Sequence, residues 1–392
     1  HGFQERITTD IYPSDFAWTP DWVNHDVRID HWYHNMDVVK ESGQAMATYQ
    51  IDYDDEVEFT ARRRLFDYGR DDTKPWCMVA SFIHPHDPYL ARPEWWNLYD
   101  DADIDMPLHP EYTEEAHGKR VLSSIEAYDK PLSDDEIRAA RRAYYANVSY
   151  FDGKVGALVK TVEEMGQLDN TIIIVTADHG DMLGEKGLWY KMTMFERSVR
   201  IPMIIAGPGV VQGTNDSPVS LVDLLPTMVA MGGGSDAQFG MAISGRSLMP
   251  ELQGQETDGE AIAEYCAEMT GHPIFMIRRG PFKYIHCDGD PAILYNVTDD
   301  PEERTNLAAD PAHADRAQAF ADEVALRWDS SAIRNEVIAS QQNRFALNRT
   351  MPGGASDDWD YNPPSDASQQ YVRNNSDWSE VAERFRFPKV PS

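Results

Sequence analysis

The residues best suited to chemistry lie in one short stretch, residues 171–191, which reads TIIIVTADHGDMLGEKGLWYK. Its β-branched start is typical of a buried strand, and Asp178 and His179 follow where that strand is expected to end. Ligands in open α/β sheets bind beyond the carboxyl ends of the strands. A carboxylate and a neutral imidazole side by side could ligate one metal ion there, and Lys191, on a segment returning to the same edge, could hold an anion. An isolated Asp-His-Gly would also suit a polar turn without a metal.

The elements that position these residues repeat one pattern, an apolar run followed by polar or glycine-rich residues. The apolar runs are residues 77–83, 171–175 and 202–206. Between the first two, Ser133 and Glu136 form a capping-box sequence that predicts the start of a long helix, and Gly166 suits its end. The apolar face expected for this helix comprises Ile137, Tyr144, Val148, Phe151, Val155, Leu158 and Val162. Strand, helix and strand in this order predict an α/β fold, with a mostly parallel sheet flanked by helices.

The pattern changes near residue 255, where short strands separated by turn residues predict an antiparallel meander. The expected strands are 262–266, 274–278, 282–287 and 293–297, followed by helices over 312–328 and 332–347. From residue 351 the chain is rich in Asp, Asn, Pro and Ser, with scattered aromatic residues. We therefore expect an α/β catalytic domain over 1–254, a small α+β domain over 255–350 built on an antiparallel sheet, and an extended tail over 351–392. The tail is expected to dock on the chain itself or on a neighbouring subunit.

The composition excludes several partners. The 392 residues carry 35 basic and 66 acidic side chains, a net charge of −31, which repels nucleic acid and anionic lipid. Such a charge mildly favours a cationic substrate, although a solubilising surface or a salt-adapted organism explains it as well. No apolar run approaches the length of a membrane span, and the first residues contain no secretory signal. The three cysteines lack metal-type spacing, so we expect a reducing, cytoplasmic location.

Four stretches together resemble the sulfatases of the alkaline-phosphatase superfamily, and among them the choline sulfatases. They are HGFQERITTDIYPSDFAWT (1–19), SFIHPHDPY (81–89), TADHGDMLGEKGLWYKM (176–192) and ILYNVTDDPEERTNLA (293–308). The resemblance covers nearly the whole chain and implies an alkaline-phosphatase-like catalytic domain.

The resemblance also implies roles for individual residues. Asp178 and His179 would ligate a divalent cation, calcium first, with magnesium or manganese as alternatives. Lys191 would hold a sulfate oxygen as a point charge, and His86 would hydrogen-bond the sulfate or protonate the leaving alcohol. His84 is expected to support the site from behind.

On the substrate side the resemblance points to choline. A quaternary ammonium donates no hydrogen bond, so its sites depend on aromatic faces and negative charge. Trp18 and His34 match the family's aromatic wall, and Glu268 would supply the anion. The family also implies a homo-oligomer, a dimer or tetramer, in which the tail lends an acidic residue, here Asp377 or Glu380, to a neighbouring pocket.

The chain departs from the family at the nucleophile. Sulfatases use a formylglycine made from the Cys or Ser of Cys/Ser-x-Pro-x-Arg, and this sequence contains no such motif. We expect the formylglycine on an amino-terminal segment that is missing here and that could bind as a separate fragment. The chain alone is then expected to be inactive.

Three functions remain open at this point. The first is hydrolysis of choline O-sulfate to choline and sulfate, assisted by the metal and formylglycine. The second is a phosphonate monoester or phosphodiester hydrolase of the same superfamily, and the third is a non-catalytic choline-binding remnant.

Overall fold

The structure is a computed structural model that describes residues 3–8, 11, 19–25, 34–71, 73–100, 104–235 and 239–350. The helices are α1 (Met36–Lys40), α2 (Tyr49–Arg70), α3 (Pro93–Trp96), α4 (Ala116–Ser124), α5 (Asp134–Glu164), α6 (Glu196–Val199), α7 (Leu224–Met231), α8 (Met249–Leu252), α9 (Ala314–Arg327) and α10 (Ser330–Thr350). The strands are β1 (Gly43–Gln44), β2 (Leu90–Ala91), β3 (Ile173–Thr176), β4 (Met203–Ala206), β5 (Glu260–Tyr265), β6 (Ile274–Arg279), β7 (Phe282–Cys287) and β8 (Ile293–Asn296).

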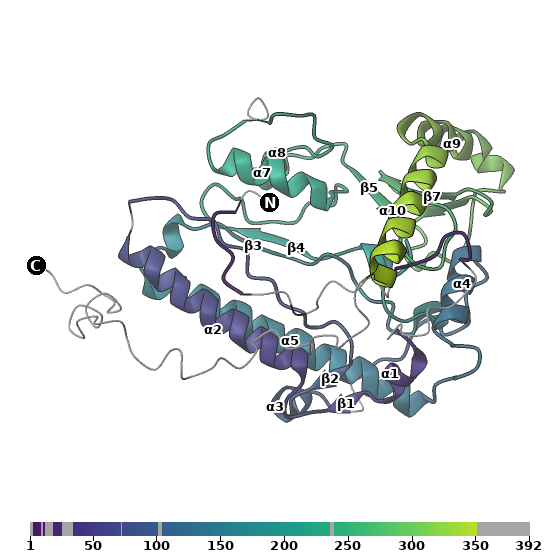
Figure 1. Cartoon of the computed structure of the whole chain (residues 1–392). Helices are drawn as coiled ribbons and strands as arrows, with labels where there is room; N and C mark the ends of the chain where they lie inside the picture. Colours follow the sequence, from purple (N-terminus) through teal and green to yellow (C-terminus); the bar gives the residue numbers. More distant parts are fainter. Residues whose placement is uncertain are drawn as a thin grey trace, which may run out of the picture.

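The long helices α2 and α5 lie side by side and form one layer, with the β3–β4 pair above them and α7 beyond it (Figure 1). Helix α5 begins as expected, because Ser133 and Glu136 form a complete capping box. It ends just before Gly166, whose φ of 69° lies in the left-handed region that glycine tolerates. Helix α2 is capped by Thr48, whose side chain accepts from the backbone N–H of Ile51.

The runs expected to form strands at 171–175 and 202–206 do so, as β3 and β4. The two strands pair antiparallel, with Ile173 opposite Ala206, whereas β1 and β2 pair in parallel. The run at 77–83 is not assigned as a strand in the described structure. A strand needs a hydrogen-bonded neighbour, and no backbone hydrogen bond from residues 77–82 to another described strand is present.

A cavity of about 3710 Å³ opens between residues 77–83, α5 and β3. Most of the apolar face expected for α5, from Tyr144 to Val162, lines this cavity, and Val148 on it is 41% exposed. The fully buried residues of α5 include the small side chains Ala140, Ala143 and Ala146. On the neighbouring strand β4, Ile204 is 60% exposed. Among the described residues, nothing closes this apolar face.

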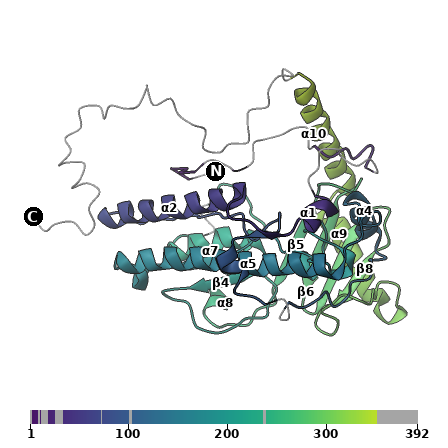
Figure 2. The same cartoon turned by 90° about the horizontal axis from the view of Figure 1, so that it is seen from below.

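The expected meander is confirmed as a four-stranded antiparallel sheet in the order β5-β6-β7-β8. In Figure 2 the labelled strands β5, β6 and β8 lie on the same side of the molecule as α9. Strand β6 is buried on both faces because successive side chains alternate between two cores. Ile274 and Met276 join the core shared with the catalytic part, and Phe275 and Ile277 pack toward α9. The ring of Phe275 stacks on Trp328, with centroids 4.7 Å apart.

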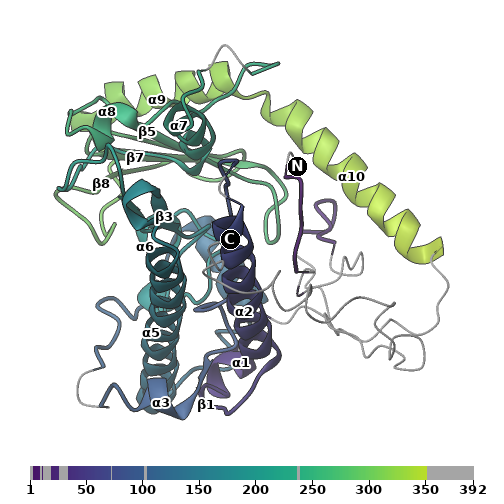
Figure 3. The same ribbon diagram turned by 90° about the vertical axis from the view of Figure 1, so that its left-hand side faces the viewer.

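The predicted α/β catalytic part and the smaller antiparallel unit are thus both present. A continuous core that includes Met36, Leu188 and Met276 crosses the expected boundary at residue 254, so the placement of that boundary stays a prediction. Helix α10 extends beyond the sheet (Figure 3), and the predicted tail at 351–392 lies outside the described residues. Among the helices that the structure describes, none is long and apolar enough to cross a membrane.

Candidate active site

Four polar side chains from distant parts of the chain meet in one cluster: His34, His86, Asp87 and Lys191. The Nζ atom of Lys191 lies 2.5 Å from Nε2 of His86 and 3.3 Å from Nε2 of His34. The Oδ1 atom of Asp87 lies 3.4 Å from Nε2 of His34 and 3.1 Å from Nδ1 of His86. Asp87 and His34 are buried, while His86 is partly open to solvent. The cluster is therefore a compact polar site at the edge of the core.

The hydrogen bonds of His86 define which of its ring nitrogens carries the proton. Its Nδ1 lies 2.8 Å from the carbonyl oxygen of Asp87, so Nδ1–H donates and Nε2 presents a lone pair to the Lys191 ammonium. Burial lowers the pKa of His86 to about 4, with the charge of Asp87 opposing and that of Lys191 reinforcing the shift. His86 is therefore neutral near pH 7 and can accept a hydrogen bond from Lys191.

Burial and the surrounding carboxylates shift the pKa of Lys191 in opposite directions. Burial lowers the pKa of Lys191, and the negative charges of Asp87, Asp181 and Glu268 act against that shift. Burial alone would raise the pKa of Asp87, but the hydrogen bond to His34 and the neighbouring positive charges bring it below its ordinary value. The site therefore contains one buried carboxylate and one lysine, and the lysine contacts the imidazoles of both His34 and His86.

The expected metal ligands Asp178 and His179 lie beside this cluster. The His179 ring lies 5.8 Å from the His86 ring, measured between centroids, and its Nδ1 donates to the Gly180 carbonyl at 2.8 Å. The Nε2 atom is consequently available, and it lies 3.7 Å from Oδ2 of Asp178. Two donors bound to one calcium ion at about 2.3–2.6 Å each can be separated by that distance. The pair therefore fits a divalent cation, and the exposed Asp178 carboxylate faces solvent, where further ligands can enter.

A second set of residues also has metal-ligand spacing. One ligand atom each from His34, His86 and Asp87 lies within 4.8 Å of the others. The Lys191 ammonium, however, contacts both imidazoles of this set. A cation placed there would be repelled at close range by that charge. This contact favours an anion at the set, and the role of Asp178 and His179 as cation ligands stays a prediction.

The segment that carries Lys191 and the expected metal ligands is a tight turn stabilised by a buried carboxylate. Asp181 accepts hydrogen bonds from the backbone N–H of Leu183 and Tyr190 and from the Tyr89 hydroxyl. Burial raises the pKa of Asp181 to about 7. Gly180 is required because a Cβ there would lie 2.2 Å from the Arg197 carbonyl oxygen. The turn thus fixes residues 178–180 relative to Lys191.

Of the residues expected on the substrate side, the structure brings two near Lys191. Glu268 lies close enough for its charge to act on Lys191, and its Oε2 accepts from the Tyr265 hydroxyl at 3.1 Å. His34 packs against the Tyr190 ring, with centroids 4.6 Å apart, and contacts Lys191. Trp18 lies outside the described residues. The choline-wall roles of Trp18 and His34 stay predictions.

No role was predicted for Asp87, although the motif HPHDP contains it. Its contacts with His34 and His86 make it the central acceptor of the cluster. The sequence signal that could have identified Asp87 is a carboxylate directly after a candidate catalytic histidine. His84, in contrast, points away from the cluster to Asp54, as expected of a supporting residue.

Comparison with known proteins identifies the family of the chain. The family model described as Sulfatase matches residues 17–234. The model described as Choline sulfatase enzyme C terminal matches residues 335–387, and that of N-sulphoglucosamine sulphohydrolase, C-terminal, matches residues 184–327.

The chain is 41% identical to a choline-sulfatase of Rhizobium meliloti over 399 residues, covering 99% of this chain and 78% of that protein. It is 27% identical to the multifunctional alkaline phosphatase superfamily protein PehA of Trinickia caryophylli, covering 71% of this chain and 60% of that protein. The crystal structure of a phosphonate monoester hydrolase of Agrobacterium radiobacter has a TM-score of 0.56 and 21% identity, covering 81% of this chain and 66% of that one. This last likeness concerns the fold alone.

The chain belongs to the sulfatase family, in the group that contains the choline-sulfatases. It is an enzyme of the class that hydrolyses sulfuric esters, with an alkaline-phosphatase-like fold.

Proposed function

We propose that this protein hydrolyses choline O-sulfate to choline and sulfate. The observation that carries the proposal is the position of Lys191 between His86 and His34, beside Asp178 and His179, with Glu268 near enough to act on its charge. The 41% identity to the Rhizobium choline-sulfatase supports choline as the alcohol.

In this proposal the chain's own residues bind and neutralise the sulfate. Lys191 donates to one sulfate oxygen, because a buried ammonium contributes far more to anion binding than a solvated one. The Lys191 ammonium donates a hydrogen bond to Nε2 of His86, and this pair supplies the proton for the leaving alcohol oxygen. Asp87 holds the His86 ring in place through the carbonyl that accepts from Nδ1.

The metal would be held by Asp178 and His179, with calcium as the first candidate and magnesium or manganese as alternatives. When bound, such an ion polarises a sulfate oxygen and offsets its charge. The choline ammonium would lie toward Glu268, with Trp18 and His34 as its aromatic wall.

The nucleophile is proposed to come from a formylglycine on a polypeptide segment outside this sequence, which contains no Cys/Ser-x-Pro-x-Arg. The apolar cavity beside β3, with Val148 and Ile204 exposed, is the surface on which we expect that segment to pack. Intact-mass spectrometry of purified material should then detect the aldehyde, and it also shows whether a second polypeptide co-purifies. A cytoplasmic location and a homo-oligomer, dimer or tetramer, are part of the same proposal.

Substrate selection tests the proposal most directly. Kinetics of the active enzyme on choline O-sulfate, a neutral aryl sulfate and an aryl phosphonate diester should give the highest kcat/KM for choline O-sulfate. Trp18→Ala and Glu268→Gln should raise KM for choline O-sulfate several-fold more than for the aryl sulfate, because only the former carries an ammonium. Chelation should abolish turnover, and calcium should restore it.

The other outcomes are equally specific. Highest kcat/KM on the phosphonate diester would favour a phosphonate monoester or phosphodiester hydrolase. Tight choline binding without turnover, in a preparation whose nucleophile is intact, would favour a non-catalytic choline-binding protein. Equal effects of the two variants on both sulfates would contradict their choline-wall roles.

A further inference from the structure

The loop that carries His86 and Asp87 is anchored by the carboxylate of Asp54, which has no role in the proposed catalysis. Asp54 lies on α2 and is fully buried, with 0% of its surface exposed. Its Oδ1 accepts from the backbone N–H of Ile83 at 2.8 Å. Its Oδ2 accepts from the backbone N–H of His84 at 3.1 Å and from Nδ1 of His84 at 2.7 Å. One side chain therefore fixes both the backbone and the first histidine of the loop.

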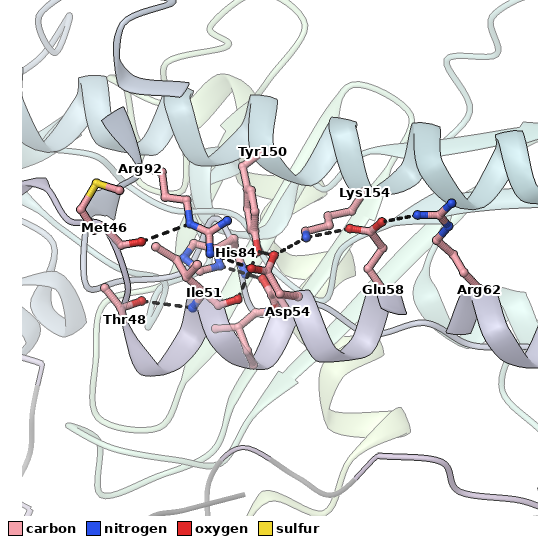
Figure 4. A network of polar contacts seen from close by, with 12 residues as sticks. Met46, Thr48, Ile51, Asp54, Glu58, Arg62, His84, Arg92, Tyr150 and Lys154 are labelled. Atoms are coloured by element: carbon pink, nitrogen blue, oxygen red, sulfur yellow. Dashed lines mark hydrogen bonds and ion pairs between the residues drawn. The ribbon is translucent and has the colours of Figure 1, made fainter. Parts of the chain in front are cut away.

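The next residue on the helix, Asp55, performs the same task at the far end of the loop. Its Oδ2 accepts from Arg92 at 2.6 Å, and its Oδ1 accepts from the Tyr150 hydroxyl at 2.8 Å and from Lys154. The Tyr150 ring also meets the His84 ring edge-on, with centroids 5.2 Å apart. Figure 4 shows Asp54, His84, Tyr150, Arg92 and Lys154 in this network between α2 and α5. The loop is thus tied to the helix layer before and after His86.

We propose that Asp54 is a positioning residue for the sulfate site: through Ile83 and His84 it sets the place of His86 against Lys191. The inference deepens the proposed function and rests on it, because His86 is the group that would meet the sulfate. Asp54 touches neither His86 nor Lys191, so any effect it has on the anion must pass through the loop.

The chemistry of three converging N–H donors explains why this residue is a carboxylate. A carboxylate accepts at both oxygens, whereas an amide has one accepting oxygen and turns an NH₂ group toward the other donors. Asp54→Asn would therefore leave a buried donor without an acceptor and displace the loop. A shift of about 1 Å at a reacting group can cost roughly 100-fold in rate.

The test measures two affinities of the full chain by calorimetry, for calcium and for choline O-sulfate in the presence of calcium. Asp54→Asn should weaken choline O-sulfate binding about tenfold or more, the loss expected when a hydrogen bond to a charged group is misplaced. Calcium binding should change less than about twofold, since Asp178 and His179 lie on a different segment. Asp52→Asn is the matched control, because Asp52 is exposed on the same helix, and it should leave both affinities unchanged.

A double-mutant cycle separates positioning from general destabilisation. In a His86→Ala background, Asp54→Asn should cost less than about twofold in choline O-sulfate affinity, because its effect passes through His86. Glu303→Gln, which disturbs another buried carboxylate paired with Lys283, should lower the melting temperature and leave the affinity unchanged. Equal losses with and without His86 would overturn the proposal.

A second pair of variants serves if Asp54→Asn fails to fold. His84→Ala removes one of the three donors and should weaken choline O-sulfate binding several-fold. His84→Asn keeps an N–H donor near the position of Nδ1 and should restore most of it. Identical losses in the two variants would refute the hydrogen-bond role. If the wild-type chain binds calcium but not choline O-sulfate, the proposed function fails instead.

Discussion

The antiparallel sheet β5–β8 and the β3–β4 pair are built from similar apolar residues but are completed in different ways. In the sheet, β6 has both faces buried, one against the catalytic part and one against α9. The β3–β4 pair borders a cavity of about 3710 Å³ and leaves Ile204 60% exposed. The sheet β5–β8 is completed by strands that are consecutive along the chain. The β3–β4 pair, which leads into the candidate site, remains open on one face.

The sheet β5–β8 contributes mainly to stability, whereas the β3–β4 region holds the candidate site. The strand neighbours in β5–β8 are consecutive in sequence, so each pairing needs only a short turn such as the one at Gly280. The site instead gathers His34, His86 and Lys191 from widely separated segments, and a loop and a tight turn hold them. Polar groups at such an edge are positioned for ligands more than for packing.

Replacing Lys191 should produce the largest effect and tests whether the open region is the site. In the active enzyme, Lys191→Ala should reduce kcat/KM for choline O-sulfate by roughly 10²–10³-fold, the loss typical of a preorganised charge that faces the reacting group. Lys186→Ala is the control, since Lys186 donates to the Glu303 carbonyl and packs on Phe195 away from the cluster. A loss of less than about fivefold for Lys191→Ala would contradict its role.

Substitutions of apolar residues in the two regions should change the free energy of unfolding by different amounts. Leu294→Ala on β8 removes a side chain with 0% exposure and should lower the free energy of unfolding by about 2–5 kcal/mol. Ile204→Ala on β4, at 60% exposure, should change it by less than about 0.5 kcal/mol in the chain alone. Denaturant unfolding measures both. Equal costs would show that the β3–β4 face is closed in solution.

The next largest effect is expected on metal affinity. His179→Ala should weaken calcium binding at least roughly 10- to 100-fold, because even residues that only orient a ligand have effects of that order. Calorimetric titration measures the change, and His286→Ala on β7, a histidine paired with Asp288, serves as the control. An unaltered titration for His179→Ala would remove His179 from the metal site.

The smallest effect concerns the junction of the two regions, where His117 on α4 lies against Tyr265 and its Nε2 donates to the Met192 carbonyl at 2.7 Å. Burial lowers the pKa of His117 from 6.5 to about 4. Between these values the unfolded chain binds a proton that the folded chain does not, so stability falls as the pH decreases below 6.5.

From pH 6.5 to 5, this residue should cost about 2 kcal/mol of unfolding free energy. His117→Gln, which keeps an N–H donor, should lose correspondingly less over the same interval. Parallel pH profiles for the two proteins would show that His117 is already accessible to protons.

Much of the small unit was predictable because its signals are local. Alternating apolar strands and turn residues placed β7 at 282–287, the range that the structure has. The capping box at Ser133 likewise placed the start of α5. These features depend on residues a few positions apart, which a single sequence displays directly.

The remainder depends on contacts that no local pattern records. The run at 77–83 has strand-like composition, but a strand exists only beside a partner, and the described residues provide none. The apolar face of α5 around Val148 was predicted, but the helical pattern did not show that it lines a cavity. Asp87 is visible in the motif HPHDP, but its contact with His34 could be identified only from the fold.

A crystal structure with calcium and choline O-sulfate, with the metal located by anomalous scattering, would show where the cation and the anion bind. We predict the cation on Asp178 and His179 Nε2, and the sulfate oxygens within hydrogen-bond distance of Lys191 and His86. A cation among His34, His86 and Asp87, with Lys191 displaced from both imidazoles, would contradict it.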